Sequence, residues 1–235
     1  MTVGRLLFAL EFLHTEAEII HAELDLKTDN VMLSLEDTTI LRDFMKSEAE
    51  SPSPREKIDE SRIVYQSREF EGKGYGLLVL CGSGEARIGK RHESSPFVQP
   101  NTYKALEIIF EMPCGSALDI WNLAGLLRTA PAYLSCCIIW DPFKHLALMV
   151  ALIGPPPSEF VKRSEATEQC FGPGGLWIAH EHAAIPPVSL EGRERRLSGQ
   201  EKESFIRSMG SMLKWPPEEH STAKQLLEGP WFDTF

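Results

Sequence analysis

The chain has 235 residues, of which 43% are hydrophobic and 25% charged, and its formal net charge is −10. This composition is ordinary for a protein with one substantial core and excludes disorder over the whole length. The acidic balance argues against nucleic acid as a partner, because Lys and Arg bind phosphate backbones, and favours basic ligands, although acidity also serves plain solubility.

The five cysteines contain no Cys-x-x-Cys pair, so the sequence predicts neither a zinc knuckle nor a disulfide framework. A reduced intracellular compartment, cytoplasmic or nuclear, fits this pattern. Charged residues interrupt the apolar start, and no stretch reaches the roughly 18 apolar residues that span a membrane. We therefore expect no signal peptide and no membrane partner.

The predicted elements begin with an amphipathic helix over residues 2–16, which indicates that the chain begins partway into a domain. Residues 31–33 and 77–81 predict short buried strands, the second being the clearest in the chain. Between them, eleven of the twenty-one residues in 42–62 are charged, so we expect a solvated, disordered insert that contains Ser51-Pro52-Ser53-Pro54. These two Ser-Pro dipeptides are candidate sites for proline-directed phosphorylation, but such dipeptides are common in loops.

From about residue 102 the pattern is mainly helical. Residues 118–127 are apolar nearly all round, which is typical of a helix buried in a core. A second apolar stripe over 146–153 stops at Gly154-Pro155-Pro156-Pro157. Ser198 has capping-box spacing before the helix that contains residues 205–213, and Ser221 is the predicted cap of a short last helix. His180-Glu181-His182 is too sparse for a metal site, and we interpret it as a surface loop.

Asp25-Leu26-Lys27-Thr28-Asp29-Asn30 carries the residues from which chemistry can be argued. Phosphoryl transfer needs a carboxylate that accepts a hydroxyl proton, a cation near the transferring group and an amide oxygen that holds Mg²⁺. Asp25, Lys27 and Asn30 supply these three types in one polar loop. A plain polar turn between helix and strand is the alternative interpretation.

The surroundings of this loop resemble the catalytic-loop region of eukaryotic protein kinases, closest to the SR-protein kinase-like serine/threonine group. The resemblance continues in family order over nearly the whole chain. Its segments are 10–15, 19–21, 25–30, Val79 to Arg87 (the strand before Asp-Phe-Gly), Gln99 to Glu107 (Gln-Pro-x-x-Tyr-Arg-Ala-Pro-Glu), Asp119 to Asn122 (the buried helix whose Asp braces the catalytic loop), 151–157, 212–218 and 221–227.

The resemblance implies an α+β, mainly α-helical fold, namely the large C-terminal lobe of a protein kinase over 1–235 with a small β-ribbon. It implies transfer of the ATP γ-phosphoryl group to Ser or Thr of Arg/Ser-rich proteins. Asp25 would be the base, Lys27 would steady the γ-phosphate, and Asn30 would bind Mg²⁺. The glycine-rich loop and the strand Lys of the small lobe have no counterpart in the chain.

Further departures from the family pattern put this activity in doubt. Gly82 stands where the family has the metal-binding Asp of Asp-Phe-Gly. His21 lies four residues before Asp25 rather than two, so either Glu23 or Asp25 can fill the base position, and we favour Asp25. Glu107 would pair with an Arg whose place is taken by His220, a mostly neutral side chain.

Residues 127–139 do not resemble the family, and we interpret them as a divergent insertion or a faulty splice join. We therefore expect impaired catalysis. The alternatives are a pseudokinase-like module that binds basic peptides without chemistry and a truncated gene-model fragment that does not fold alone.

Overall fold

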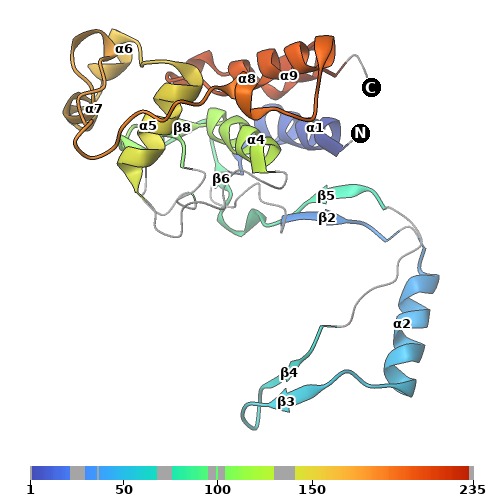
Figure 1. The fold of residues 1–235 in the computed structure, drawn as a ribbon. Coiled ribbons are helices and arrows are strands. Elements are labelled where there is room, and N and C mark those ends of the chain that lie inside the picture. Colours follow the sequence, from blue (N-terminus) through green and yellow to red (C-terminus); the bar gives the residue numbers. More distant parts are fainter. Residues whose placement is uncertain are drawn as a thin grey trace. The chain divides into compact units, whose positions relative to one another are not determined.

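The computed structural model describes residues 2–21, 30–35, 37–67, 76–94, 99, 104–129 and 141–232 (Figure 1). Asp25 and Lys27 lie outside the described residues, as do Glu23 and residues 130–140 of the divergent segment. The chain divides into a larger unit, Met1–Asn30 with Leu80–Phe235, and a smaller unit, Val31–Val79.

The larger unit is mainly helical. Its helices are α1 (Thr2–Thr15), α3 (Leu106–Ile109), α4 (Ala117–Thr129), α5 (Pro142–Ile153), α6 (Ser158–Val161), α7 (Glu165–Cys170), α8 (Leu190–Arg193), α9 (Gly199–Met212) and α10 (Ala223–Leu227), with 3-10 turns η2 (Ser83–Glu85), η4 (Pro173–Gly175) and η5 (Pro217–Glu219). Its strands form two antiparallel ribbons: β1 (Ile19–Ile20) with β6 (Arg87–Ile88), and β7 (Arg91–His92) with β8 (Cys114–Gly115). The predicted mainly helical fold with small ribbons is confirmed.

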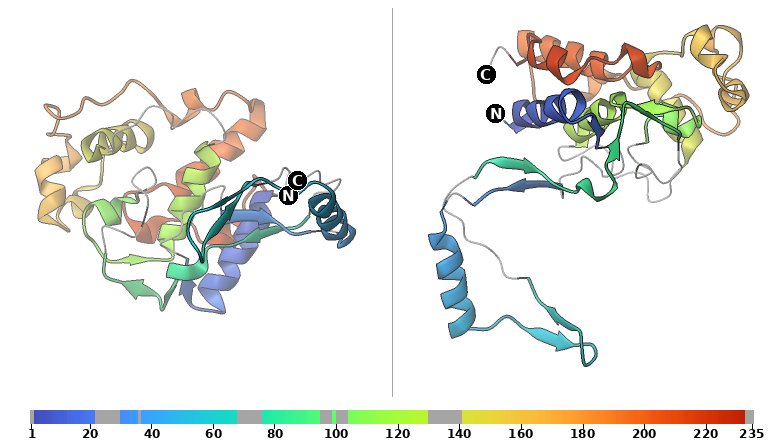
Figure 2. Two further views of the ribbon diagram at one scale, coloured as in Figure 1. Left: turned by 90° about the horizontal axis from the view of Figure 1, so that it is seen from below. Right: turned by 180° about the vertical axis from the view of Figure 1, so that it is seen from behind.

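The core of the larger unit forms where α1 packs against α10 and α4 against α9 (Figure 2). Leu7, Leu10, Leu118 and Leu123 are fully buried there, so the helix predicted over 118–127 is indeed a core helix. A second cluster of aromatic rings has centroids 5.2 to 6.4 Å apart, a spacing typical of edge-to-face packing. Its members are Phe110, Phe160, Phe171, Trp177 and Trp215.

Two helix caps differ from those that the local sequence patterns predict. Ser198 makes no side-chain cap hydrogen bond to α9, so the predicted capping box is wrong. Ser198 still occupies the N-cap position, but Gly199 follows it with a left-handed φ of 56°, which is not the helical φ of an ordinary first turn. The capping box forms instead at α10, where Thr222 and Gln225 bond reciprocally, so Thr222 rather than Ser221 is the cap.

The smaller unit contains β2 (Val31–Leu33) paired with β5 (Leu78–Leu80), helix α2 (Thr39–Glu50), and the hairpin β3 (Arg55–Lys57) with β4 (Ile63–Tyr65). The prediction of a disordered loop over 42–62 therefore missed a helix and a ribbon. Ala, Leu, Met, Lys, Arg and Glu dominate α2 and favour a helix even without burial. The solvated character was predicted correctly, since no residue of α2 is buried.

Both predicted strands of the smaller unit form, but they are not buried. Met32, Leu33 and Leu77 are each 56% exposed, and Val79 is 43% exposed. An apolar run predicts burial only when another element covers it, and no described element of the smaller unit covers these strands. Among the described helices, none has the length and apolar character that crossing a bilayer requires.

Candidate functional site

A buried carboxylate holds the backbone just before the predicted catalytic loop. Asp119, which is 1% exposed, lies in the first turn of α4, and its Oδ2 accepts a 2.9 Å hydrogen bond from the backbone N–H of His21. The same oxygen lies 2.7 Å from Nε2 of His14, in the last turn of α1. Asp119 thus fixes the end of α1 and the entry to residues 22–30 together, the bracing contact that the kinase resemblance implies.

His21 links this brace to the segment that carries Gly82. Its ring Nε2 lies 3.2 Å from the carbonyl oxygen of Cys81, and the backbone N–H of Cys81 donates a 2.8 Å hydrogen bond to the carbonyl of Asn30. The ribbon of β1 with β6 holds the same two chain segments side by side. Asn30 and Gly82, which lie far apart in the sequence, are therefore neighbours.

The Asn30 side chain packs directly onto the backbone of Gly82. A Cβ atom added at position 82 would lie 2.9 Å from Cγ and 3.0 Å from Oδ1 of Asn30. Gly82 has a left-handed backbone with φ 85° and ψ 34°, a region that Asp and Asn tolerate best among residues with side chains. A side chain at position 82 would therefore point at the amide of Asn30.

The described residues do not by themselves fit a magnesium ion. Mg²⁺ in nucleotide sites takes one or two protein carboxylates in near-octahedral oxygen coordination. Near Gly82, Asn30 offers one amide oxygen, and the glycine offers no side-chain oxygen. Within the described ranges no three His, Cys, Asp or Glu residues are arranged to hold a metal, and His182 of the His180 segment stacks on Phe143 instead.

Gln99 and Asn122 form a second buried link to α4. The Gln99 side-chain amide donates to Oδ1 of Asn122, and Gln99 Oε1 accepts a 2.7 Å hydrogen bond from the backbone N–H of Ala105. Both side chains are buried. The link fixes the start of α3, and so the position of Glu107 within it.

Glu107 is buried without a full set of partners. It is 1% exposed, and its Oε1 has no hydrogen-bond partner. The pKa of Glu107 is raised from its ordinary 4.5 to about 7, mainly by burial and also by the nearby charge of Glu218, against an opposing backbone hydrogen bond. Close to neutral pH a large share of this side chain is therefore protonated.

His220 does not replace the arginine that pairs with this glutamate in the resemblance. Its Nδ1 lies 3.2 Å from the carbonyl oxygen of Ala117 and its Nε2 3.1 Å from that of Lys214, while its ring stacks on Trp121. Burial lowers the pKa of His220, and the neutral ring has one N–H for two carbonyls. The expected loss of the ion pair is confirmed, and His220 turns to the backbone instead.

Both His14 and His220 line a groove of about 860 Å³. Arg163 and Glu218 form a two-pronged ion pair on its wall, with Nη1 to Oε2 at 3.1 Å and Nη2 bonded to Oε1. This pair could not be predicted from the sequence, because 55 residues separate its partners and no local pattern joins them.

Comparison with known proteins also indicates a relationship to protein kinases. No family model matches the chain. It is 34% identical over 249 residues to a serine/threonine protein kinase of Aspergillus fumigatus, covering 97% of this chain and 56% of that protein. A serine/threonine-protein kinase SRPK of Physarum polycephalum is 25% identical over 253 residues, with 97% and 58% covered.

The dual specificity protein kinase CLK1 of Mus musculus is 24% identical over 228 residues, covering 95% of this chain and 42% of that protein. The chain thus spans about half the length of the curated relatives it matches. It is a homologue of the serine/threonine and dual-specificity protein kinases of the SRPK and CLK type, and its coverage is that of a partial kinase domain.

Proposed function

We propose that this chain is the catalytic-loop lobe of a serine/threonine protein kinase whose phosphoryl transfer is impaired at position 82. The observation that carries the proposal is the contact between Asn30 and Gly82, held by the His21 link to Cys81. Two segments that a kinase must bring together for nucleotide chemistry meet here, and one of them lacks its carboxylate. The large-lobe assignment rests on the mainly helical fold and the kinase homology.

In this proposal the loop at 25–30 does the remaining chemistry. Asp25 accepts the proton of the substrate hydroxyl, Lys27 lies by the transferring phosphoryl group, and Asn30 directs its amide toward position 82. The substrate class is Arg/Ser-rich protein, which suits the net charge of −10 and the SRPK-type homology. ATP with Mg²⁺ is the phosphoryl donor of the family.

Glycine at position 82 supplies no carboxylate ligand for Mg²⁺. Phosphoryl transfer is then weaker, because Mg²⁺ would offset the negative charge that develops on the phosphoryl group. Preorganised charge is commonly the largest contribution to such catalysis. Removing one acid–base group alone costs about 10² to 10⁴ in rate, and we expect the missing carboxylate to cost at least as much.

Restoring the carboxylate tests the proposal. We expect Gly82→Asp to raise the phosphorylation rate of an Arg/Ser repeat peptide at least about 100-fold over the parent protein. Asp tolerates the left-handed backbone, and the Asn30 amide has to shift by a few tenths of an ångström. Steady-state transfer from radiolabelled ATP in excess Mg²⁺ measures the gain.

Gly82→Ala is the matched control, since it brings the same Cβ and backbone strain without the carboxylate. It should leave the rate at the parent level. Asp25→Asn combined with Gly82→Asp should lose the gain. A Gly82→Asp protein that folds and stays at the parent rate contradicts the proposal.

A second candidate function is a module that holds basic peptides without chemistry. It is favoured by the same glycine, because the described residues form no metal site while the acidic charge remains. Fluorescence anisotropy with a labelled Arg/Ser peptide separates the two. Binding that is unchanged by ATP and Mg²⁺, with no gain of transfer in Gly82→Asp, supports the binding module over the impaired kinase.

A further inference from the structure

The segment between α2 and β3 presents two Ser-Pro dipeptides to solvent. Ser51, Pro52 and Pro54 are exposed and Ser53 is half-buried. A proline restricts the residue before it to extended backbone, and Ser51 has φ −142° and ψ 83°. Extended, accessible seryl residues before proline are what a proline-directed protein kinase takes as substrate.

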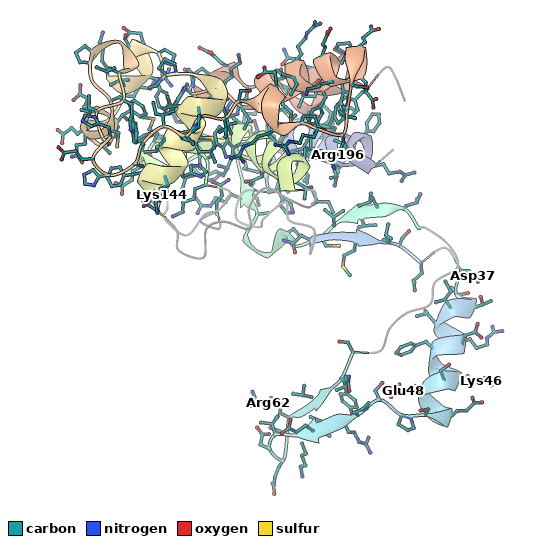
Figure 3. The ribbon with its side chains drawn as sticks, viewed as in Figure 1. Asp37, Lys46, Glu48, Arg62, Lys144 and Arg196 are labelled. Atoms are coloured by element: carbon teal, nitrogen blue, oxygen red, sulfur yellow. The ribbon has the colours of Figure 1, made fainter. Side chains whose placement is uncertain are left out.

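Ser53 is held to the helix by one carboxylate. Oε1 of Glu48 accepts a 2.6 Å hydrogen bond from the Ser53 backbone N–H, and Oε2 accepts a 2.8 Å bond from the Ser53 hydroxyl. Glu48 lies in the C-terminal part of α2, on the side that leads to the hairpin (Figure 3). We call this two-bond contact the Glu48–Ser53 clasp; it ties the start of the hairpin to the end of α2.

We propose that Ser53 is phosphorylated by a separate proline-directed protein kinase and that the phosphate opens the Glu48–Ser53 clasp. In this step the Ser53 oxygen forms a bond to the γ-phosphorus of ATP. The bond from that phosphorus to the oxygen bridging the β- and γ-phosphates breaks, and ADP leaves. The hydroxyl proton passes to the base of the modifying kinase.

The clasp opens because modification reverses what Ser53 offers to Glu48. The hydroxyl loses its donated hydrogen, and the phosphate brings a charge of about −1.5 to −2 at pH 7. That charge faces the Glu48 carboxylate and the negative end of the α2 dipole, and both repel it. The contact that joined helix and hairpin becomes a repulsion.

The strand after the clasp supplies the new partners. Arg55 and Lys57 are exposed and project from one side of β3, because side chains alternate along a strand. Phosphate pairs well with guanidinium groups, so we infer that modified Ser53 exchanges Glu48 for Arg55. The end of α2 is then released from the hairpin. This inference is independent of the proposed kinase activity.

The site is tested with the purified protein, a recombinant mitogen-activated protein kinase and ATP with Mg²⁺, followed by tandem mass spectrometry. We expect phosphate on Ser53 in the parent protein and in Ser51→Ala. Ser61 is the internal control, since its N–H and hydroxyl are both bonded to Asp59 but Arg62 follows it. An unmodified Ser53, or equal modification of Ser61, overturns the proposal.

The opening is tested by hydrogen exchange on the double variant Ser51→Ala, Ser95→Ala, so that Ser53 is the sole Ser-Pro acceptor in the sequence. We expect the amides of residues 49–51 and 53 to exchange about tenfold faster after modification, as the loss of one charged hydrogen bond predicts. Glu48→Gln, which removes the repelling charge, should show a smaller change on modification. Arg55→Gln, which removes the new partner of the phosphate, should also show a smaller change. Phosphorylation that leaves exchange in these amides unchanged contradicts the clasp mechanism.

Discussion

Two buried carboxylates, Asp119 in α4 and Glu107 in α3, have opposite surroundings. Asp119 accepts a hydrogen bond from His21 and contacts His14, so its burial is matched by polar partners. Glu107 is buried to the same extent, yet one of its oxygens has no partner and its pKa rises to about 7. A buried carboxylate with hydrogen-bond donors can order a loop. A buried carboxylate that lacks donors lowers the stability of the fold in a pH-dependent way.

Asp119 and Glu107 differ in the side chains that could pair with them. The two histidines near Asp119 give it a backbone N–H and a ring nitrogen, whereas His220 gives Glu107 nothing and bonds to Ala117 and Lys214. Position 82 is comparable, because Gly82 itself brings no carboxylate to the Asn30 side chain that it contacts. Among the described residues, the contacts that join His21, Cys81 and Asp119 are present, whereas Gly82 and His220 bring no charge to Asn30 and Glu107.

Removing Asp119 should have the largest effect on this comparison. Asp119→Ala leaves the N–H of His21 buried and unsatisfied, and we expect it to lower the free energy of unfolding by about 3 to 4 kcal/mol. Urea unfolding followed by circular dichroism measures the loss. Asp141→Ala is the control: Asp141 accepts two backbone N–H bonds at the partly exposed cap of α5, so about 1 kcal/mol is expected. Equal losses would mean that burial of Asp119 is unimportant.

Glu107 should make the fold less stable as pH rises. Below pH 4.5 both folded and unfolded forms are protonated; between 4.5 and about 7 only the unfolded form ionises, so stability falls and then levels off. We expect a loss of roughly 3 kcal/mol across this window, absent in Glu107→Gln. Urea unfolding at a series of pH values measures it.

Glu194 should contribute a pH dependence of stability opposite in sign to that of Glu107, and Glu194→Gln should remove it. Burial alone raises the pKa of Glu194, but hydrogen bonds from Arg196 and Leu197 outweigh it and lower the pKa below its usual value. Its contribution is therefore present at neutral pH and lost on acidification.

A parent protein whose stability does not fall between pH 4.5 and 7, relative to Glu107→Gln, contradicts the account of Glu107.

His220→Arg should give the buried Glu107 carboxylate a charged partner and so stabilise the fold. A guanidinium at this position can donate to the unpartnered oxygen of Glu107, and we expect about 1 to 2 kcal/mol of added stability at pH 8. The gain should shrink below pH 5, where Glu107 is protonated in both variant and parent. His220→Lys is the matched control, because it brings the charge without the planar fork. Thermal unfolding at the two pH values decides, and a pH-independent gain would exclude the pair.

The smallest effect is expected from the Arg163–Glu218 pair, which is partly exposed. Glu218→Gln should change stability by less than about 1 kcal/mol, yet lower the pKa of Glu107 by removing a nearby negative charge. Arg163→Gln should raise it, since Glu218 then faces Glu107 unpaired. The midpoint of the pH-dependent stability loss reports both shifts, and movement in the same direction for both variants would exclude Glu218 as the cause.

Local sequence determined much of the fold. The apolar helix over 118–127, the stripe over 146–153 with its Gly-Pro stop, and the first helix all form, because side-chain periodicity alone decides which face a helix can bury. The order of kinase-like motifs also pointed correctly to the family that the homologues show. The roles of Asp25, Lys27 and Asn30 in transfer remain predictions.

Tertiary structure decided the partners. Periodicity carries no information about which distant group meets a buried polar atom, so the unpartnered oxygen of Glu107, the turn of His220 to the backbone and the Arg163–Glu218 pair could not be predicted from spacing. Burial of the strands at 31–33 and 78–80 likewise depends on what covers them. The sequence by itself specified which residues are apolar and where helices stop, and only the packed chain determined which charges are paired, because pairing depends on distances between segments far apart in the sequence.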